Sequence, residues 1–194
     1  LIEICLVTGL VSDRFVTAYN IQNLLYRTSL FGIISIGAAF VIITRGIDLS
    51  IGSVVCLTGC LTPYLLVEKG WSPWIAVPGL LALGAGIGAL QGWLVTRWRI
   101  QPFVVTLCGL LVYRGVARGV TADQTQGFRT TYDGLRWFGN GQLPITESFA
   151  IPVPFVMLVI IAALAAVFLN RTVWGRHLLA LGSNEEAARY SGSR

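Results

Sequence analysis

Charged side chains are scarce in this sequence. Of its 194 residues, 12% are charged and 55% are hydrophobic, and the mean hydropathy is +0.72. Soluble domains usually carry about 25% charged residues, so the composition excludes an ordinary soluble fold. A chain this apolar needs lipid around it, where a helix satisfies its own backbone hydrogen bonds. The sequence therefore predicts an integral membrane protein.

Lysine and histidine are almost absent, which excludes several kinds of active site. The only lysine, Lys69, lies in Glu68-Lys69-Gly70, whereas a phosphate-binding P-loop requires G-x-x-x-x-G-K-[ST]. The only histidine, His177, has no cysteine or carboxylate ligand close to it in sequence. We therefore expect no catalytic residues, no metal site and no cofactor, and any ATP hydrolysis would take place on another chain.

Cysteines are few, and all four lie in apolar segments: Cys5, Cys56, Cys60 and Cys108. This placement argues against a disulfide framework. Cys56 and Cys60 are one helical turn apart, a spacing that also suits a metal pair, but no third ligand is near. We interpret both as small buried packing residues.

Basic residues give a formal net charge of +5 but do not cluster. They are scattered between apolar stretches, without the stripe that a nucleic-acid-binding surface requires. We therefore expect no nucleic-acid partner.

Long apolar runs, in contrast, are abundant. A helix needs roughly 20 apolar residues to cross about 30 Å of hydrocarbon. The opening residues read as the end of one span whose start is missing, because no methionine or basic leader precedes them. The sequence predicts an all-α, polytopic transmembrane helical bundle with about six spans. These are expected at 1–11 (partial), 24–44, 51–67, 74–96, 102–120 and 149–169.

Charge bias orients such spans, because cytoplasmic connections carry an excess of Lys and Arg. We place the tail inside, which makes residues 1–170 the transmembrane region and 171–194 a cytoplasmic segment. The basic residues alone do not decide this orientation, but most of the acids then fall in outer connections. The expected connections are 45–50 and 97–101 inside, and 12–23, 68–73 and 121–148 outside.

Three glycines repeat every fourth residue in the span at 74–96, namely Gly84, Gly88 and Gly92. This spacing lines one helix face with small residues, so another helix can approach closely. Helix packing is the simpler interpretation, and a helix that lines a substrate path is the functional one.

The inner connection at 45–50 continues into Ile51-Gly52-Ser53. We expect one helix to stop at Gly46 and the next to begin with Asp48 or Ser50 as its N-cap. A tight capped turn explains these residues, although irregular backbone at membrane depth usually lines a cavity or a site.

Arg114 is the one ionisable residue well inside a long span, about 18 Å along the helix from Pro102. Its side chain either extends to the membrane surface together with Arg118 or faces a wet path and binds polar groups. The residues leave both interpretations open.

The polar tail predicts a short helix with Ser183 or Asn184 as its N-cap and Glu186 completing a capping box. Ala187 and Ala188 would form a small apolar face. Such a helix suits docking into a groove of another protein, but it also suits a plain solvated segment between spans.

Several of these motifs, in this order, resemble the permease subunits of bacterial ABC importers for ribose, galactose, xylose and related monosaccharides. The match covers residues from about 34 to 192. Arg45 departs from the family signature GGIDLSVGS by replacing its first glycine. The matching stretches are 46–50 with Gly52 and Ser53, then Gln91-Gly92 with 100–107, Tyr113-Arg114-Gly115, and 175–177 with 182–189.

The resemblance implies a non-catalytic, multi-pass permease subunit in the bacterial cytoplasmic (inner) membrane. It would translocate a monosaccharide or similar small polar solute. The implied partners are an ABC ATPase subunit, a periplasmic sugar-binding protein and a second permease subunit, in a homo- or heterodimer within the lipid bilayer. The alternative is a secondary transporter or channel without an ATPase. The implied sites are a signature turn (Gly46, Asp48, Ser50, Gly52, Ser53), a possible pathway (Gln91, Thr106, Tyr113, Arg114) and an ATPase-coupling helix (Asn184, Glu185, Glu186, Ala187, Ala188, Arg189, Gly192).

Overall fold

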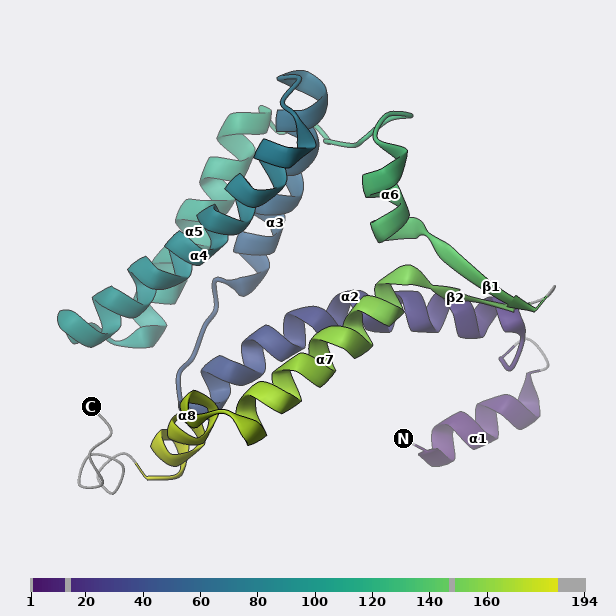
Figure 1. The fold of residues 1–194 in the computed structure, drawn as a ribbon, viewed down its shortest axis with the longest axis horizontal. Coiled ribbons are helices and arrows are strands. Elements are labelled where there is room, and N and C mark those ends of the chain that lie inside the picture. The colour runs from purple at the N-terminus through teal and green to yellow at the C-terminus, as the bar shows by residue number, and fades with distance from the viewer. Residues whose placement is uncertain (1, 13–14, 147–148, 185–194) are drawn as a thin grey trace. The chain divides into compact units, whose positions relative to one another are not determined.

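The structure is a computed structural model that describes residues 2–12, 15–146 and 149–184. Helices dominate it, and one short hairpin interrupts them (Figure 1). In chain order the elements are α1 (Ile2–Val11), α2 (Ala18–Ile43), α3 (Ile51–Pro63), the π-helix η1 (Tyr64–Glu68), α4 (Pro73–Arg97), α5 (Pro102–Thr121), α6 (Asp133–Asn140), β1 (Gln142–Thr146), β2 (Phe149–Pro152), α7 (Val153–Arg171) and α8 (Val173–Ser183).

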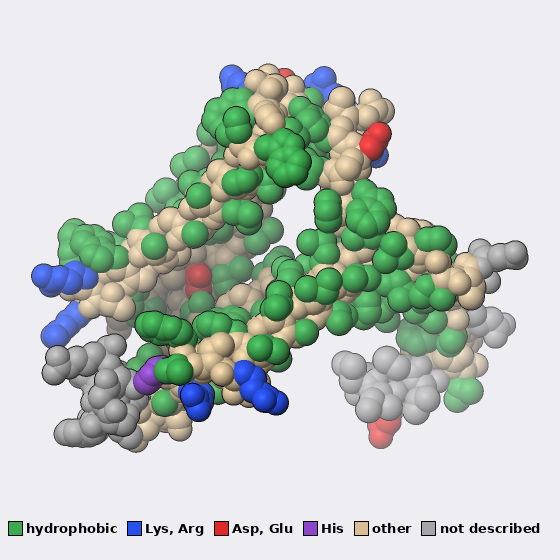
Figure 2. All heavy atoms as spheres, in the orientation of Figure 1, with side chains coloured by type: hydrophobic (Ala, Val, Ile, Leu, Met, Phe, Trp, Pro, Cys, Tyr) green, Lys and Arg blue, Asp and Glu red, His purple; other side chains and the backbone are tan. Residues whose placement is uncertain are grey.

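Within the described residues, five helical segments are long and apolar enough to cross a membrane: α2, α3 with η1, α4, α5 and α7. Each segment contains an apolar stretch of 18 residues, and the rest of the chain buries at most 22% of that stretch. Figure 2 accordingly shows hydrophobic side chains covering the long helices, with Lys and Arg gathered near their ends. The prediction of an all-α, multi-pass membrane protein is confirmed. The helix α1 has 10 residues, and the partial span expected at 1–11 stays a prediction.

The chain divides into two compact units, one formed by Phe40–Tyr132 and the other by Leu1–Ala39 with Asp133–Arg194. In the first, α3 packs against both α4 and α5 (Figure 1). Its buried apolar side chains include Leu57, Leu66 and Val105. Pro73 and Pro102 begin α4 and α5, because the first helical position needs no N–H donor and proline already has the required φ.

The second unit contains α6, α7, α8 and the β1–β2 hairpin, together with α2 as far as Ala39. The predicted span at 149–169 is wrong at its start, because Phe149–Pro152 forms β2 and pairs antiparallel with β1. Pro152 and Pro154 explain the difference. Ile151 precedes Pro152 and is therefore driven toward extended backbone, whereas Pro154 fits the first turn of a helix, where no N–H donor is needed, so the helix begins at Val153.

Candidate functional site

The turn between α2 and α3 ends the first helix with a Schellman motif. Arg45 N–H donates to the Ile42 carbonyl at 2.9 Å, and Gly46 N–H donates to the Val41 carbonyl at 2.9 Å. The residue with left-handed backbone is Arg45, at φ 60°, not the expected Gly46. Gly46 serves a different purpose, since a Cβ there would lie 2.9 Å from Val41 Cγ1.

Asp48 and Ser50 form a local polar pair at the start of α3. Asp48 Oδ1 accepts hydrogen bonds from the Ser50 N–H and the Ser50 hydroxyl, both at 2.7 Å. Ser50 stands at the N-cap position, but neither its hydroxyl nor Asp48 accepts an N–H from within α3. The predicted cap by the Ser50 hydroxyl is therefore wrong, because its oxygen turns to side chains outside α3, whereas Asp48 accepts the N–H of the N-cap residue itself.

Ser50 also contacts Gln91, a buried residue of α4. A hydroxyl has one proton, and Ser50 donates it to Asp48, so Ser50 Oγ accepts from Gln91 Nε2 at 2.9 Å. The same Nε2 lies 3.2 Å from Tyr113 Oη on α5. We call Asp48, Ser50, Gln91 and Tyr113 the Gln91 network. It satisfies polar groups that would be costly to bury unpaired among apolar helices.

Gly109 makes room for this network. A Cβ at Gly109 would lie 2.6 Å from Gln91 Nε2, 2.9 Å from Tyr113 Cε2 and 3.4 Å from Ser50 Cβ. The sequence interpretation missed Gly109, although a signal was present. Thr106, Gly109 and Tyr113 follow each other at helical spacing and so share one face of α5.

Thr106 lies against the same turn. It is buried, and its hydroxyl is 3.4 Å from the Ile47 carbonyl and 2.9 Å from the Pro102 carbonyl. A cavity of about 270 Å³ lies between the turn, α4 and α5. Its polar lining comprises Thr44, Asp48, Gln91, Thr96 and Thr106. These groups offer hydrogen bonds and one carboxylate. Such a lining suits holding a polar group in place rather than making or breaking covalent bonds.

The structure thus brings three of the four predicted pathway residues, Gln91, Thr106 and Tyr113, to the signature turn. Ser53 is also buried there, and its hydroxyl donates to the Ser50 carbonyl at 2.7 Å. Arg114 lies apart on an exposed position of α5. Gly52 is exposed, with nothing within 4 Å of a Cβ placed on it.

The glycine face of α4 is open within the described residues. A Cβ at Gly84, Gly88 or Gly92 would meet no atom within 4 Å. Gly88 and Gly92 border the cavity beside the turn, and Gly84 borders a second hollow between α3 and α4. The described residues place no atom against this face, so the role of the three glycines in helix packing stays a prediction.

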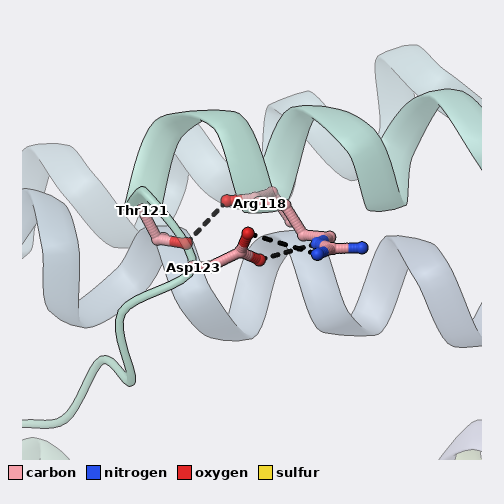
Figure 3. A network of polar contacts seen from close by, with 4 residues as sticks. Arg118, Thr121 and Asp123 are labelled. Atoms are coloured by element: carbon pink, nitrogen blue, oxygen red, sulfur yellow. Dashed lines mark hydrogen bonds and ion pairs between the residues drawn. The ribbon is translucent and has the colours of Figure 1, made fainter.

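At the opposite end of α5, an ion pair closes the helix. Arg118 Nε and Nη2 donate to Asp123 Oδ1 and Oδ2 at 2.6 and 3.2 Å, and Figure 3 shows the two groups facing each other. The chain turns there through Ala122, whose φ is 49°. The guanidinium of Arg118, through this hydrogen bond and its charge, lowers the pKa of the Asp123 carboxyl. Both side chains are exposed.

The tail begins with α8, a helix that the sequence interpretation did not predict. Thr172 caps it, because its hydroxyl oxygen accepts the Gly175 N–H at 3.0 Å. A side chain at Gly175 would overlap the backbone of Phe168 and Leu169. Ser183 is the last residue of α8 and Asn184 N–H donates to the Ala180 carbonyl at 3.0 Å, so Ser183 is not the predicted N-cap. The other predicted coupling residues, 185–192, lie outside the described residues.

Metal ligands do not gather in the described part of the chain, where no group of three or more His, Cys, Asp or Glu side chains could hold an ion. Cys56, Cys60 and Cys108 are free thiols. Cys56 and Cys108 are exposed rather than buried, because the long helices turn most of their surface away from the chain itself.

Comparisons with known proteins place these features in a family context. The family described as branched-chain amino acid transport system / permease component matches residues 20–194. The chain is 36% identical over 195 residues to the ribose import permease protein RbsC of Escherichia coli (strain K12), covering 99% of this chain and 59% of that protein. It is 34% identical over 188 residues to the ribose import permease protein RbsC of Bacillus subtilis (strain 168), covering 96% and 56%.

A third relative is the D-allose transport system permease protein AlsC of Escherichia coli (strain K12), 31% identical over 185 residues, with 95% of this chain and 54% of that protein covered. The chain therefore spans less than two thirds of the length of these relatives. No solved structure matches it.

Proposed function

The chain belongs to the family of branched-chain amino acid transport system permease components, and from this premise we propose that it is part of the permease subunit of an ABC importer. The imported solute is a monosaccharide or a similar small polar molecule, which crosses the bacterial cytoplasmic membrane. A separate ATPase subunit drives transport, a periplasmic binding protein delivers the solute, and a second permease subunit completes the pore. The permease itself makes and breaks no covalent bond.

The observation that carries the proposal is the meeting of separate sequence motifs at one place. Asp48 and Ser50, Gln91, and Tyr113 come from three stretches that resemble sugar-importer permeases, and they join in one hydrogen-bonded network. This network ties the inner turn to α4 and α5. Alternating access needs such a coupling, because helices that move as one body transmit a displacement, whereas independent helices do not.

We place ATPase docking on the segment from Asn184 to Gly192. The support is its position directly after α8, which Thr172 and Gly175 connect to α7 at a tight corner. A push on this segment would be passed through α8 to a membrane-spanning helix. The small side chains of Ala187 and Ala188 would allow a close approach to the groove of a partner.

The test is co-purification of the full-length protein with the ATPase and binding protein encoded beside it. We expect a stable complex whose ATP hydrolysis rises when a sugar-loaded binding protein is added, together with ATP-dependent uptake in proteoliposomes. Ala188→Trp should abolish both, while Thr125→Trp, in the outer connection, should leave both intact. Solute uptake without any ATPase would instead establish the secondary transporter or channel.

A further inference from the structure

A second polar cavity lies in the unit formed by Leu1–Ala39 and Asp133–Arg194. It has a volume of about 250 Å³ and opens between the first turns of α2, the end of α6 and the start of β1. None of the residues that line it carries a charge. Its polar lining consists of Tyr19, Gln22, Asn23, Tyr26, Asn140 and Gln142, and we call it the Tyr26 pocket.

The frame of this pocket is held by hydrogen bonds between separate elements. Tyr26 Oη donates to Asn140 Oδ1 at 3.0 Å and so connects α2 to the last residue of α6. Gly141 N–H donates to the Trp137 carbonyl at 2.7 Å, and Val153 N–H donates to the Gly141 carbonyl at 2.8 Å. These bonds tie the end of α6 to the start of α7 across the hairpin.

The remaining polar groups are available to a ligand. Within the described residues, the side-chain amides of Gln22, Asn23 and Gln142 make no hydrogen bond. A carboxamide both donates and accepts hydrogen bonds, and so does a tyrosine hydroxyl. This matches the hydroxyl groups of a sugar, each of which also donates and accepts. The tyrosine rings add flat apolar surface with a polar tip.

The absence of charge from the lining discriminates between solute classes. A zwitterionic amino acid would bring an ammonium and a carboxylate, each of which is costly to desolvate without a partner of opposite charge. The lining offers no such partner. The volume is also slightly below the range of roughly 300–1,000 Å³ typical of pockets for drug-sized ligands. The pocket therefore suits one sugar ring rather than an amino acid or an oligosaccharide.

We propose that the Tyr26 pocket is a subsite for a neutral polyhydroxylated solute of monosaccharide size. The inference rests on the proposed function, which it deepens by assigning residues and a solute class. The lining comes from two connections predicted to lie outside, 12–23 and 121–148, and from the elements that adjoin them. The subsite would thus receive the solute on its release from the binding protein.

The experiment measures protection of a thiol in the full-length permease. Gln142→Cys is introduced after replacing Cys5, Cys56, Cys60 and Cys108 by serine, and its reaction with a soluble maleimide is timed with D-ribose or L-leucine present. We expect ribose to slow labelling at least threefold and leucine to leave it unchanged. Thr130→Cys, outside the pocket, is the control and should be insensitive to both. Adding Gln22→Leu or Asn23→Leu should raise the ribose concentration needed for protection at least tenfold.

The outcomes separate this inference from the function on which it rests. A permease that imports ribose with its ATPase, but whose Gln142→Cys variant is not protected by ribose, overturns the subsite and leaves the importer standing. Protection by ribose in a protein that recruits no ATPase supports the subsite and removes the ABC importer. Protection by leucine instead of ribose overturns the proposed solute class.

Discussion

Gln91 Nε2 lies 2.9 Å from Ser50 Oγ, which joins two residues 41 positions apart in the sequence. The contact fixes the turn between α2 and α3 against α4, and Tyr113 extends it to α5. Because the amide is buried, its removal leaves Ser50 and Tyr113 without this hydrogen-bond partner. The network therefore makes α3, α4 and α5 depend on one another, and this dependence can be measured.

The pair energy between Ser50 and Gln91 follows from a double-mutant cycle. Ser50→Ala and Gln91→Leu should each destabilise the full-length protein by about 1–3 kcal/mol. Together they should cost less than their sum by roughly 1 kcal/mol, since the second change removes a contact already lost. Unfolding in mixed detergent micelles gives these values. Thr58→Val, paired with Gln91→Leu, is the control and should be additive, because the Thr58 hydroxyl bonds to the Val54 and Val55 carbonyls of its own helix.

Gly109 should tolerate no larger side chain. Gly109→Ala places a methyl group 2.6 Å from Gln91 Nε2, so the network must shift, and we expect a loss of about 1–3 kcal/mol, as for other overpacked sites. Gly119→Ala on the same helix meets no atom within 4 Å and should be neutral or slightly stabilising. Thermal unfolding of the two purified variants decides the matter. Equal melting temperatures would contradict the tight approach of α5 to Gln91.

Arg45 occupies a left-handed position that glycine adopts without steric cost. Arg45→Gly should therefore stabilise the protein by roughly 1 kcal/mol, even though it removes a charged side chain. Gly46→Ala should do the opposite, because its Cβ would lie 2.9 Å from Val41 Cγ1. Denaturant unfolding of both variants against the parent gives the sign. A destabilised Arg45→Gly variant would show that the contacts of the arginine outweigh its backbone strain.

The carboxyl of Asp123 should have a pKa below the usual aspartate value of about 3.9, because Arg118 donates two hydrogen bonds to it. Because the pKa of Asp123 is lower in the folded protein, the ion pair contributes its full stabilisation to the end of α5 when the pH is above the usual aspartate pKa. The contribution is lost as the pH falls through the lower, folded-state pKa. Carbon-13 NMR of labelled aspartate carboxyls measures this, and Arg118→Gln should restore the ordinary pKa. Arg136→Gln, which removes the partner of Asp133, should leave the Asp123 titration unchanged.

The long spans were predictable because their composition and length are local properties. Pro73 and Pro102 even mark the first residues of α4 and α5. The start of α7 was harder to predict. Phe149–Pro152 lacks polar side chains, as does most of the helix that follows, and its pairing with β1 depends on a neighbouring strand. The helix α8 was not predicted, because Arg176 and His177 make the tail look polar, although Thr172 is a typical N-cap residue.

The amino-acid sequence by itself determined that this protein is a multi-pass membrane protein, because only helices with long apolar surfaces are stable in hydrocarbon. It also marked Asp48, Ser50, Gln91 and Tyr113 as unusual, through motifs that resemble those of sugar importers. Only the tertiary structure decided that these four side chains meet and that Gly109 gives them space. The spacing of residues along a helix determines which of them share a face, but the packing of one helix on another determines what that face touches.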